Sequence, residues 1–308
     1  MVMTHVKHTK AMVLLQDLNM MDRFLFDEVL EDPETHQDVL NIILPGKIEL
    51  LDKNEVEKQL QTSPYLKSVR LDVFAMDNEK TVYNTEMQKN WKSDLRKRSR
   101  FYQALIDSGL LPAGNLNYNK LNDSYIIMIT PFDLFGYGLY QYTFESTCQE
   151  VPNLQIEDGA TRIFLNTKGT NPQDVSEELV EFLKYVEKTD NDTAAEVKSE
   201  RVKRIHRRVL EIKSNEEMGV KYMQAWEEKA YEREEGREEG REEGELNKVI
   251  NQIKRKVLKN LSPETIAEHL DESVSFVERV CNMIEENPDA DADTIRSILQ
   301  GDTDKTVI

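Results

Sequence analysis

Two acidic residues, Asp72 and Glu86, lie at equal distances from Glu79 in the stretch VRLDVFAMDNEKTVYNTEMQ (69–88). The stretch has two alternating runs on either side of residues 77–80, a pattern that predicts a β-hairpin. A loop centred on Glu79 places the two carboxylates directly opposite each other, with Cβ atoms ~5 Å apart. Carboxylates this close repel each other unless a proton or a cation lies between them. The pair therefore predicts a site for Mg²⁺ or Mn²⁺, which bind carboxylate oxygens and keep several waters.

A divalent ion at this pair would polarise a phosphate oxygen and lower the pKa of a bound water, which is the chemistry of phosphodiester hydrolysis. Gln88 falls on the same face of the hairpin as Glu86, and its amide is placed to orient that water. The alternative is an ordinary hairpin with a solvated polar face, on which Arg70 neutralises the pair. The alternation puts Asp72 and Phe74 on this face and an apolar set on the other face: Val69, Leu71, Val73, Ala75, Tyr83 and Met87.

The segment after the hairpin, KNWKSDLRKRSRFYQALI (89–106), is predicted to be a helix that runs from Lys89 to Gly109. It contains six basic residues and a single acidic residue, Asp94, although the whole chain is acidic. A local basic patch beside a carboxylate site is suited to a phosphate backbone, whereas the alternative is internal pairing with acidic helices. The residues predicted to contact DNA are Lys92, Arg96, Arg98 and Arg100.

The elements around the hairpin predict an α/β domain with a mixed sheet. Residues 20–44 indicate a helix that is broken once, at Asp32-Pro33. SYIIMIT (124–130) is typical of a buried strand, and two further strands are predicted at 137–144 and 162–166. These elements fill a predicted first domain, residues 1–190.

From residue 191 the chain is charged and helix-favouring, and it contains the repeat EREEGREEGREEGEL (232–246). We interpret 191–245 as a charged helical connector and 246–308 as a small helix-turn-helix-like tail. In the tail, Ser262 before Pro263 predicts a helix start, and Ser275 with Glu278 predicts a capping box. Between Ser262 and Gln300 there are ten acidic residues and two arginines, so most of the tail surface would repel DNA phosphates. We therefore expect the tail to mediate self-association and not to read DNA sequence.

The composition limits the classes of function. A net charge of −18 over 308 residues excludes a protein that coats nucleic acid by bulk attraction. Two distant cysteines, Cys148 and Cys281, indicate a reducing compartment, and no apolar run approaches the ~20 residues of a membrane span. The expected location is the cytoplasm. The chain has no Walker-type glycine loop, no G-x-S-x-G and no H-E-x-x-H motif.

Asp72, the triplet Glu86-Met87-Gln88 and the following RSRFYQALIDSGLL resemble the PD-(D/E)XK nuclease superfamily. More narrowly, the chain is similar to the Rpn-type recombination-promoting nucleases, also described as PD-(D/E)XK nuclease family transposases. The similarity extends over roughly residues 20–260, including DRFLFDEVLED near the N-terminus and the EGREEG-type repeat. It implies a restriction-endonuclease-like core that hydrolyses DNA phosphodiesters with Mg²⁺, in recombination or transposition.

The resemblance also implies roles for single residues. Asp72 would be a metal ligand, Glu86 the acid of the E-x-K element, and the backbone carbonyl of Met87 a further ligand. Gln88 stands where the superfamily usually has lysine, although glutamine is similar to what this branch carries.

An acidic residue from a preceding helix often completes such sites, and Glu34 is the first candidate, with Glu28 second. The alternative function is a non-catalytic DNA-binding or assembly protein that keeps the nuclease fold.

Overall fold

The structure is a computed structural model that describes residues 12–303 apart from 45, 52–54, 61–68 and 111–116. For residues 55–60, 69–71, 302 and 303 it describes the backbone alone. Contacts divide the chain into two compact units, the first ending at Met223 and the second beginning at Gln224. Each unit is described by itself.

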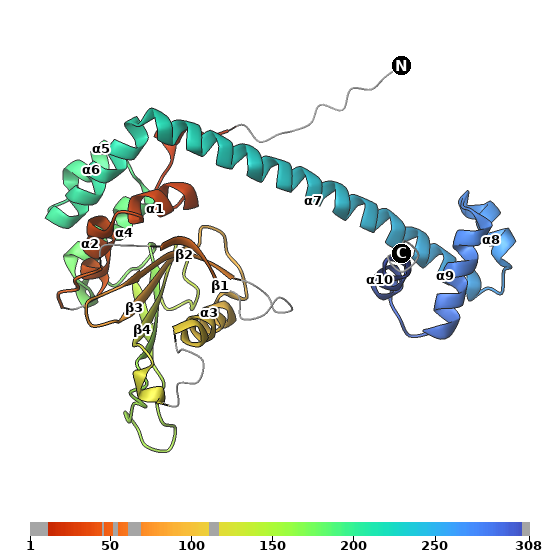
Figure 1. The fold of residues 1–308 in the computed structure, drawn as a ribbon, viewed down its shortest axis with the longest axis horizontal. Coiled ribbons are helices and arrows are strands. Elements are labelled where there is room, and N and C mark those ends of the chain that lie inside the picture. Colours follow the sequence, from red (N-terminus) through yellow and green to blue (C-terminus); the bar gives the residue numbers. More distant parts are fainter. Residues whose placement is uncertain (1–11, 45, 52–54, 61–68, 111–116, 304–308) are drawn as a thin grey trace. The chain divides into compact units, whose positions relative to one another are not determined.

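The first unit is built on a six-stranded mixed sheet with the order β1-β2-β3-β4-β6-β5 (Figure 1). Strands β1, β2 and β3 pair antiparallel, β3, β4 and β6 pair parallel, and β5 closes the far edge antiparallel to β6. The bounds are Glu55–Leu60 (β1), Val69–Met76 (β2), Val82–Met87 (β3), Ser124–Thr130 (β4), Gln141–Phe144 (β5) and Ala160–Asn166 (β6).

Helices cover both faces of this sheet (Figure 1). Helix α3 (Leu95–Leu110) packs on one face, where its apolar residues share a core with Phe74, Ile126 and Phe164. The other face carries α1 (Arg23–Leu30), α2 (Pro33–Ile43), α4 (Glu177–Glu187) and α6 (Glu200–Ser214), and the short α5 (Asn191–Glu196) packs against α4 and α6. A strand inside such a sheet is buried on both sides, which explains why every residue of β3 is buried.

The predicted helix break at Asp32-Pro33 is confirmed. The side chain of Asp32 accepts a hydrogen bond of 2.8 Å from the N–H of Thr35, and Pro33 occupies the first turn of α2. An N-cap acceptor followed by proline favours a helix start, because the cap side chain accepts from a first-turn N–H that has no partner in the helix and proline has no N–H to leave unpaired.

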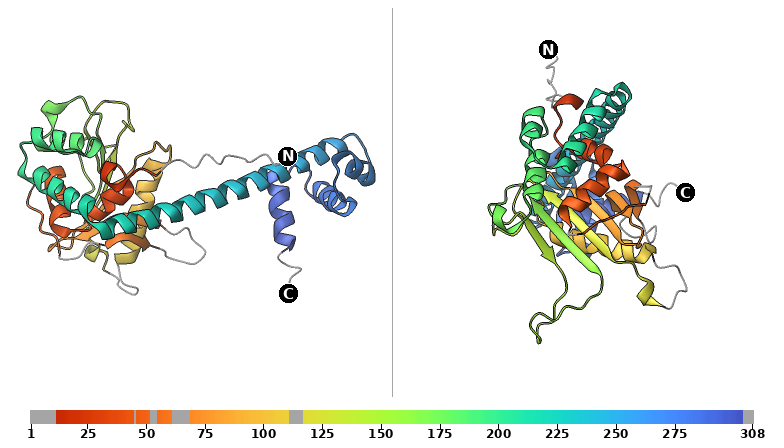
Figure 2. Two further views of the ribbon diagram at one scale, coloured as in Figure 1. Left: turned by 90° about the horizontal axis from the view of Figure 1, so that it is seen from above. Right: turned by 90° about the vertical axis from the view of Figure 1, so that its left-hand side faces the viewer.

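Two predicted elements are shorter than expected. Helix α3 begins at Leu95 instead of Lys89, because the N–H of Gln88 still bonds the carbonyl of Ile129, at 2.9 Å, and the chain must leave the sheet before a helix can start. The strand predicted at 137–144 is formed only from Gln141 onward. The residues before it turn around the Asp133 carboxylate, which accepts bonds from the N–H groups of Gly136 and Gly138, both at positive φ. Beyond β5, the connection 145–159 projects away from the sheet (Figure 2).

The second unit contains most of α7 (Glu216–Val257), followed by α8 (Pro263–Leu270), α9 (Val274–Glu286) and α10 (Ala292–Thr303). The predicted long charged helix and small helical tail are therefore confirmed, with the repeat 232–246 inside α7. Val274, the first residue of α9, is 40% exposed and lies outside the apolar core of this unit. Fully buried residues of this core are Ile250, Ile253, Ile266, Val277, Val280 and Ile295.

The helix starts in the tail confirm one prediction and correct another. Ser262 caps α8 by accepting from the N–H of Thr265, with Pro263 in the first turn, as predicted. The capping box at Ser275 is wrong: Ser273 caps α9 instead, accepting from the N–H of Phe276, because the helix already begins at Val274. The domain limits at residues 190 and 245 remain predictions. No helix in the described parts of the chain has the length and apolar character to cross a membrane.

Candidate metal and active site

The hairpin has the predicted register. Thr85 pairs with Val73 and Tyr83 pairs with Ala75, so the loop is centred on Glu79. The same register continued by one step places Asp72 opposite Glu86. The turn is held by Asp77, whose carboxylate accepts from the N–H of Glu79 at 2.9 Å and from the N–H of Thr81 at 2.8 Å.

The alternative of a solvated polar face is wrong. Asp72 is 2% exposed and Glu86 is 1% exposed, with Arg23 of α1 beside Asp72 and Arg98 of α3 beside Glu86. Phe74, on that same face, belongs to the apolar core under α3, so the hairpin does not have one polar and one apolar face as predicted. The proposed partner Arg70 lies outside the described side chains. The carboxylates of Asp72 and Glu86 are therefore both buried, next to each other.

Hydrogen bonds fix both carboxylates across the strand pair. Glu86 Oε1 accepts from the N–H of Asp72 at 3.2 Å and from Asn84 Nδ2 at 3.1 Å. Asp72 Oδ2 accepts from the N–H of Met87 at 3.3 Å. Because the N–H and C=O of a strand residue point to the same side, the Met87 carbonyl also lies on the edge of β3 that faces Asp72.

Two guanidinium groups compensate the buried negative charge. Arg23 Nη2 lies 2.5 Å from Asp72 Oδ1, and Arg23 Nε lies 3.4 Å from Asp27 Oδ2 on the same helix. Arg98 Nη2, from α3, lies 3.3 Å from Glu86 Oε2. The sequence interpretation missed Arg23 and Asp27. Their spacing of four residues puts them on one face of α1, but nothing in the sequence shows that this face reaches β2.

The electrostatics of Glu86 differ from those of an exposed carboxyl. Burial, and next the negative charge of Asp72, raise the pKa of Glu86 to about 7, against an opposing effect of Arg98. Burial and the charge of Glu86 raise the pKa of the neighbouring Tyr102 to about 12, so its hydroxyl keeps its proton in the physiological range. The carboxyl of Glu86 therefore exchanges its proton near neutral pH, above the range of an exposed glutamate.

The donors at this site fit a hard divalent ion. The side chains of Asp72 and Glu86 and the carbonyl of Met87 offer oxygen atoms, which Mg²⁺ accepts together with several waters. In the described part of the chain, no set of three or more His, Cys, Asp or Glu residues is arranged to hold a metal. The set is thus two carboxylates and one carbonyl.

The two predicted third ligands lie elsewhere. Glu34 is exposed in the first turn of α2, and no described hydrogen bond or ion pair connects it to either carboxylate. Glu28 is buried in α1, but its Oε1 lies 2.6 Å from Nζ of Lys221. Asp27, which shares Arg23 with Asp72, is the acidic residue of the preceding helix that the structure connects to the pair.

The predicted water-orienting residue has other partners. Gln88 Oε1 accepts from Arg98 Nη1 at 2.9 Å, and Gln88 Nε2 donates to the carbonyl of Asn90 at 2.8 Å. These partners also fix which end of the amide is the oxygen, because a reversed amide would point N–H groups at a guanidinium.

The four predicted DNA contacts divide into two kinds. Arg98 points inward to Glu86, Gln88 and Tyr102. Arg96 Nη2 donates to the carbonyl of Leu134 at 2.7 Å, and its guanidinium lies 4.9 Å from the centre of the Phe135 ring. Lys92 and Arg100 are exposed, and no ion pair among the described residues occupies them.

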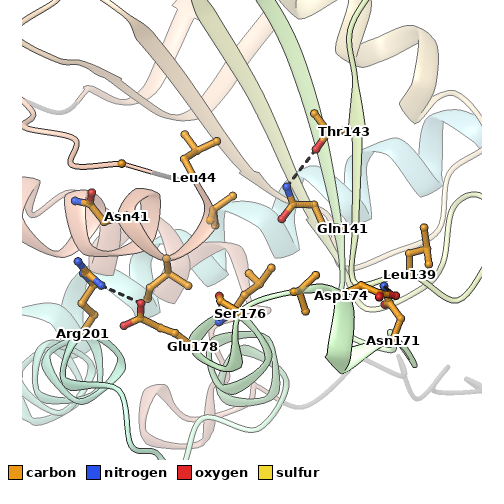
Figure 3. A pocket seen from close by; sticks show the side chains of 15 residues that line it. Asn41, Leu44, Leu139, Gln141, Thr143, Asn171, Asp174, Ser176, Glu178 and Arg201 are labelled. Atoms are coloured by element: carbon orange, nitrogen blue, oxygen red, sulfur yellow. Dashed lines mark hydrogen bonds and ion pairs between the residues drawn. The ribbon is translucent and has the colours of Figure 1, made fainter. Parts of the chain in front are cut away.

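A cavity of about 880 Å³ lies between α2, α4 and β5, and Figure 3 shows the side chains that line it. It is open to solvent and is lined by residues from the end of α2, the start of α4 and β5, with Gln141 and Thr143 bonded to each other at 3.1 Å. An ion pair of 2.9 Å between Arg201 and Glu178 forms part of its wall. Gln141 and Thr143 alternate with Tyr142, which faces α3, so the cavity is separate from the Asp72–Glu86 site.

The chain matches the model of a known protein family. A family model described as PD-(D/E)XK nuclease family transposase matches residues 23–239, which include the hairpin, α3 and the six-stranded sheet. No curated protein and no solved structure matches the chain.

Proposed function

The chain belongs to the PD-(D/E)XK nuclease family transposases, and on that premise we propose that it is a Mg²⁺-dependent endonuclease that hydrolyses DNA phosphodiester bonds in recombination or transposition. The observation that carries the proposal is the pair of opposed, buried carboxylates, 2% and 1% exposed. Such a pair is unfavourable in a metal-free protein and becomes favourable when a dication lies between the two groups.

The residues of the site would divide the work as follows. Asp72, Glu86 and the Met87 carbonyl would hold the ion, which when bound would polarise a phosphate oxygen and lower the pKa of a bound water. Asn84 and the N–H of Asp72 fix Glu86 Oε1, leaving Oε2 on the side of Arg98. Because the pKa of Glu86 is raised to about 7, metal binding and cleavage are expected to strengthen as pH rises through neutrality.

The DNA backbone is expected to contact the exposed basic residues that follow the site. Lys89 and Lys92 are exposed between β3 and α3, and Lys97 and Arg100 are exposed on α3 itself. Trp91, 64% exposed, lies in the same segment. Since the whole chain carries −18, this local group supports DNA binding better than the overall charge does. For the acidic tail we propose self-association in place of DNA reading.

A plasmid assay tests the proposed function. Supercoiled plasmid incubated with the full chain and Mg²⁺ is expected to become relaxed or linear, and EDTA is expected to stop the conversion. Excess Mg²⁺ added after EDTA should restore it. DNA binding without cutting under all three conditions would contradict the enzyme and favour a non-catalytic DNA-binding or assembly protein that retains the fold.

The DNA contact surface makes a separate prediction. The triple change Lys92→Ala, Lys97→Ala and Arg100→Ala should weaken binding to all DNA sequences. It should also reduce the slope of log K against log salt by roughly 2–3, since each phosphate contact contributes about 0.9. Fluorescence anisotropy in EDTA, at several salt concentrations, measures both quantities.

A matched control removes the same charges on the other face of the sheet. Lys184, Lys188 and Arg207 are exposed on or beside α4 and α6, and their triple change to alanine should leave the salt slope as it is in the wild type. Equal slopes for the two triple variants would assign the basic residues of α3 to another role.

A further inference from the structure

Arg98 belongs to the buried side of α3 and reaches the hairpin. Its Nη2 lies 3.3 Å from Glu86 Oε2, its Nη1 donates to Gln88 Oε1 at 2.9 Å, and its Nε donates to the hydroxyl of Tyr102. The Arg98 guanidinium also lies 5.1 Å from the centre of the Tyr102 ring. The guanidinium is therefore held in one position by an acid, an amide and a phenol.

The Arg98 guanidinium lies beside the position at which the hairpin lacks the motif lysine. The E-x-K pattern places a lysine two residues after the acid, and Gln88 stands there in this chain. A neutral amide cannot supply positive charge to a phosphate that gains negative charge in the transition state. The Gln88 amide oxygen is instead bonded to a guanidinium that supplies a full charge at the same place.

We propose that Arg98 is a catalytic residue, which takes the place of the motif lysine by binding the phosphate under attack, and that Gln88 is a positioning residue which holds Arg98. This inference rests on the proposed nuclease function.

Arg98 has donors left for a phosphate. A guanidinium carries five N–H groups, and the three described contacts use one each on Nε, Nη1 and Nη2. One N–H on each terminal nitrogen remains, and a pair of this kind matches two oxygens of a phosphate. The side chain is 24% exposed, whereas Glu86 beside it is 2% exposed. The guanidinium thus lies at the boundary between the buried carboxylates and the surface from which DNA would approach.

The same geometry predicts opposite effects on metal binding and on cleavage. Arg98 is a cation bound to Glu86, so it competes with a dication for that carboxylate. Its removal should leave Mn²⁺ affinity equal to or higher than that of the wild type. A residue that served only to hold Glu86 in place would show the reverse, because its loss would weaken the metal site together with the activity.

The experiment is a double-mutant cycle between Arg98 and Gln88, measured by single-turnover plasmid cleavage and by Mn²⁺ calorimetry. Arg98→Ala should slow cleavage about a hundredfold or more, as expected for the loss of one donor to a developing charge. Gln88→Lys in the Arg98→Ala background should recover at least about tenfold, because it returns a cation to the motif position. Gln88→Lys alone should give no gain, since the new ammonium would face the Arg98 guanidinium.

Two further variants control for a loss of stability and for the removal of an arginine elsewhere. Arg98→Met keeps an unbranched aliphatic side chain without the guanidinium, and it replaces Arg98→Ala if that variant unfolds at a much lower temperature. Arg207→Ala removes one exposed arginine from α6 and should leave cleavage unchanged.

Cleavage by Arg98→Ala within threefold of the wild type would overturn the proposal. So would a loss that Gln88→Lys does not recover, whatever the Mn²⁺ affinity. A wild type that binds Mn²⁺ and does not cut DNA would refute the proposed function itself, and the proposed role of Arg98 would then be refuted as well.

Discussion

Glu86→Gln and Asp72→Asn are each expected to reduce plasmid cleavage by about a thousandfold or more. Each change keeps the shape of the side chain and removes the charge that would hold the ion. The ion's contribution to the transition state is several kcal/mol, and each 1.36 kcal/mol corresponds to a factor of ten in rate. Single-turnover cleavage in Mg²⁺, with protein in excess over plasmid, measures the loss.

The fold should survive both changes. Arg23 keeps Asp27 as a partner in Asp72→Asn, and Arg98 keeps Gln88 and Tyr102 in Glu86→Gln. Glu79→Gln is the matched control, because it removes a carboxylate from the exposed loop of the same hairpin, and it should cut at the wild-type rate. If both site variants also cut at that rate, the activity belongs to another site or to a contaminant.

The stability of the metal-free protein is expected to fall as pH rises from about 4.5 to about 7. Those are the ordinary pKa of a glutamate and the raised pKa of Glu86 in the fold. Between them the folded chain holds a proton that the unfolded chain has released, so raising the pH favours unfolding. The slope for one group is at most about 1.4 kcal/mol per pH unit. Above pH 7 the folded protein bears the full repulsion between Asp72 and Glu86.

Urea unfolding in EDTA at pH 5, 6, 7 and 8 measures this effect, with Glu86→Gln as the reference. The contributions of titrating groups that do not interact with Glu86 cancel in the difference between the two proteins. Mn²⁺ should raise the melting temperature of the wild type more at pH 8 than at pH 5.5, because the ion binds the fully ionised pair. Parallel stability curves for wild type and Glu86→Gln would show that Glu86 does not titrate as proposed.

The hairpin and its register could be predicted from the sequence because both depend on local rules. The alternating pattern and the symmetry about Glu79 decide which residues are opposed, and the structure has the same register. The break at Asp32-Pro33 was predictable for the same reason, since a cap and a proline act within one turn.

The counter-charges of the site could not be predicted in the same way. Arg23 and Asp72 lie 49 residues apart in sequence, and their contact depends on how α1 packs against the sheet. Arg98 is different, because a signal was present. It follows Leu95 by three residues and precedes Tyr102 by four, and both are buried on α3. Residues at this spacing share a helix face, so Arg98 belongs to the packed side of α3 and not to its solvated side. The six basic residues of segment 89–106 therefore do not all lie on one solvated surface.

The most direct test of a metal site on Asp72 and Glu86 is Mn²⁺ calorimetry on the wild type, Asp72→Asn and Glu86→Gln at pH 8, above the raised pKa of Glu86. The wild type should bind a Mn²⁺ ion that neither variant binds at the same concentrations. Wild-type Mn²⁺ binding that persists unchanged in both variants would contradict the assignment, because the ion would then be held by other residues.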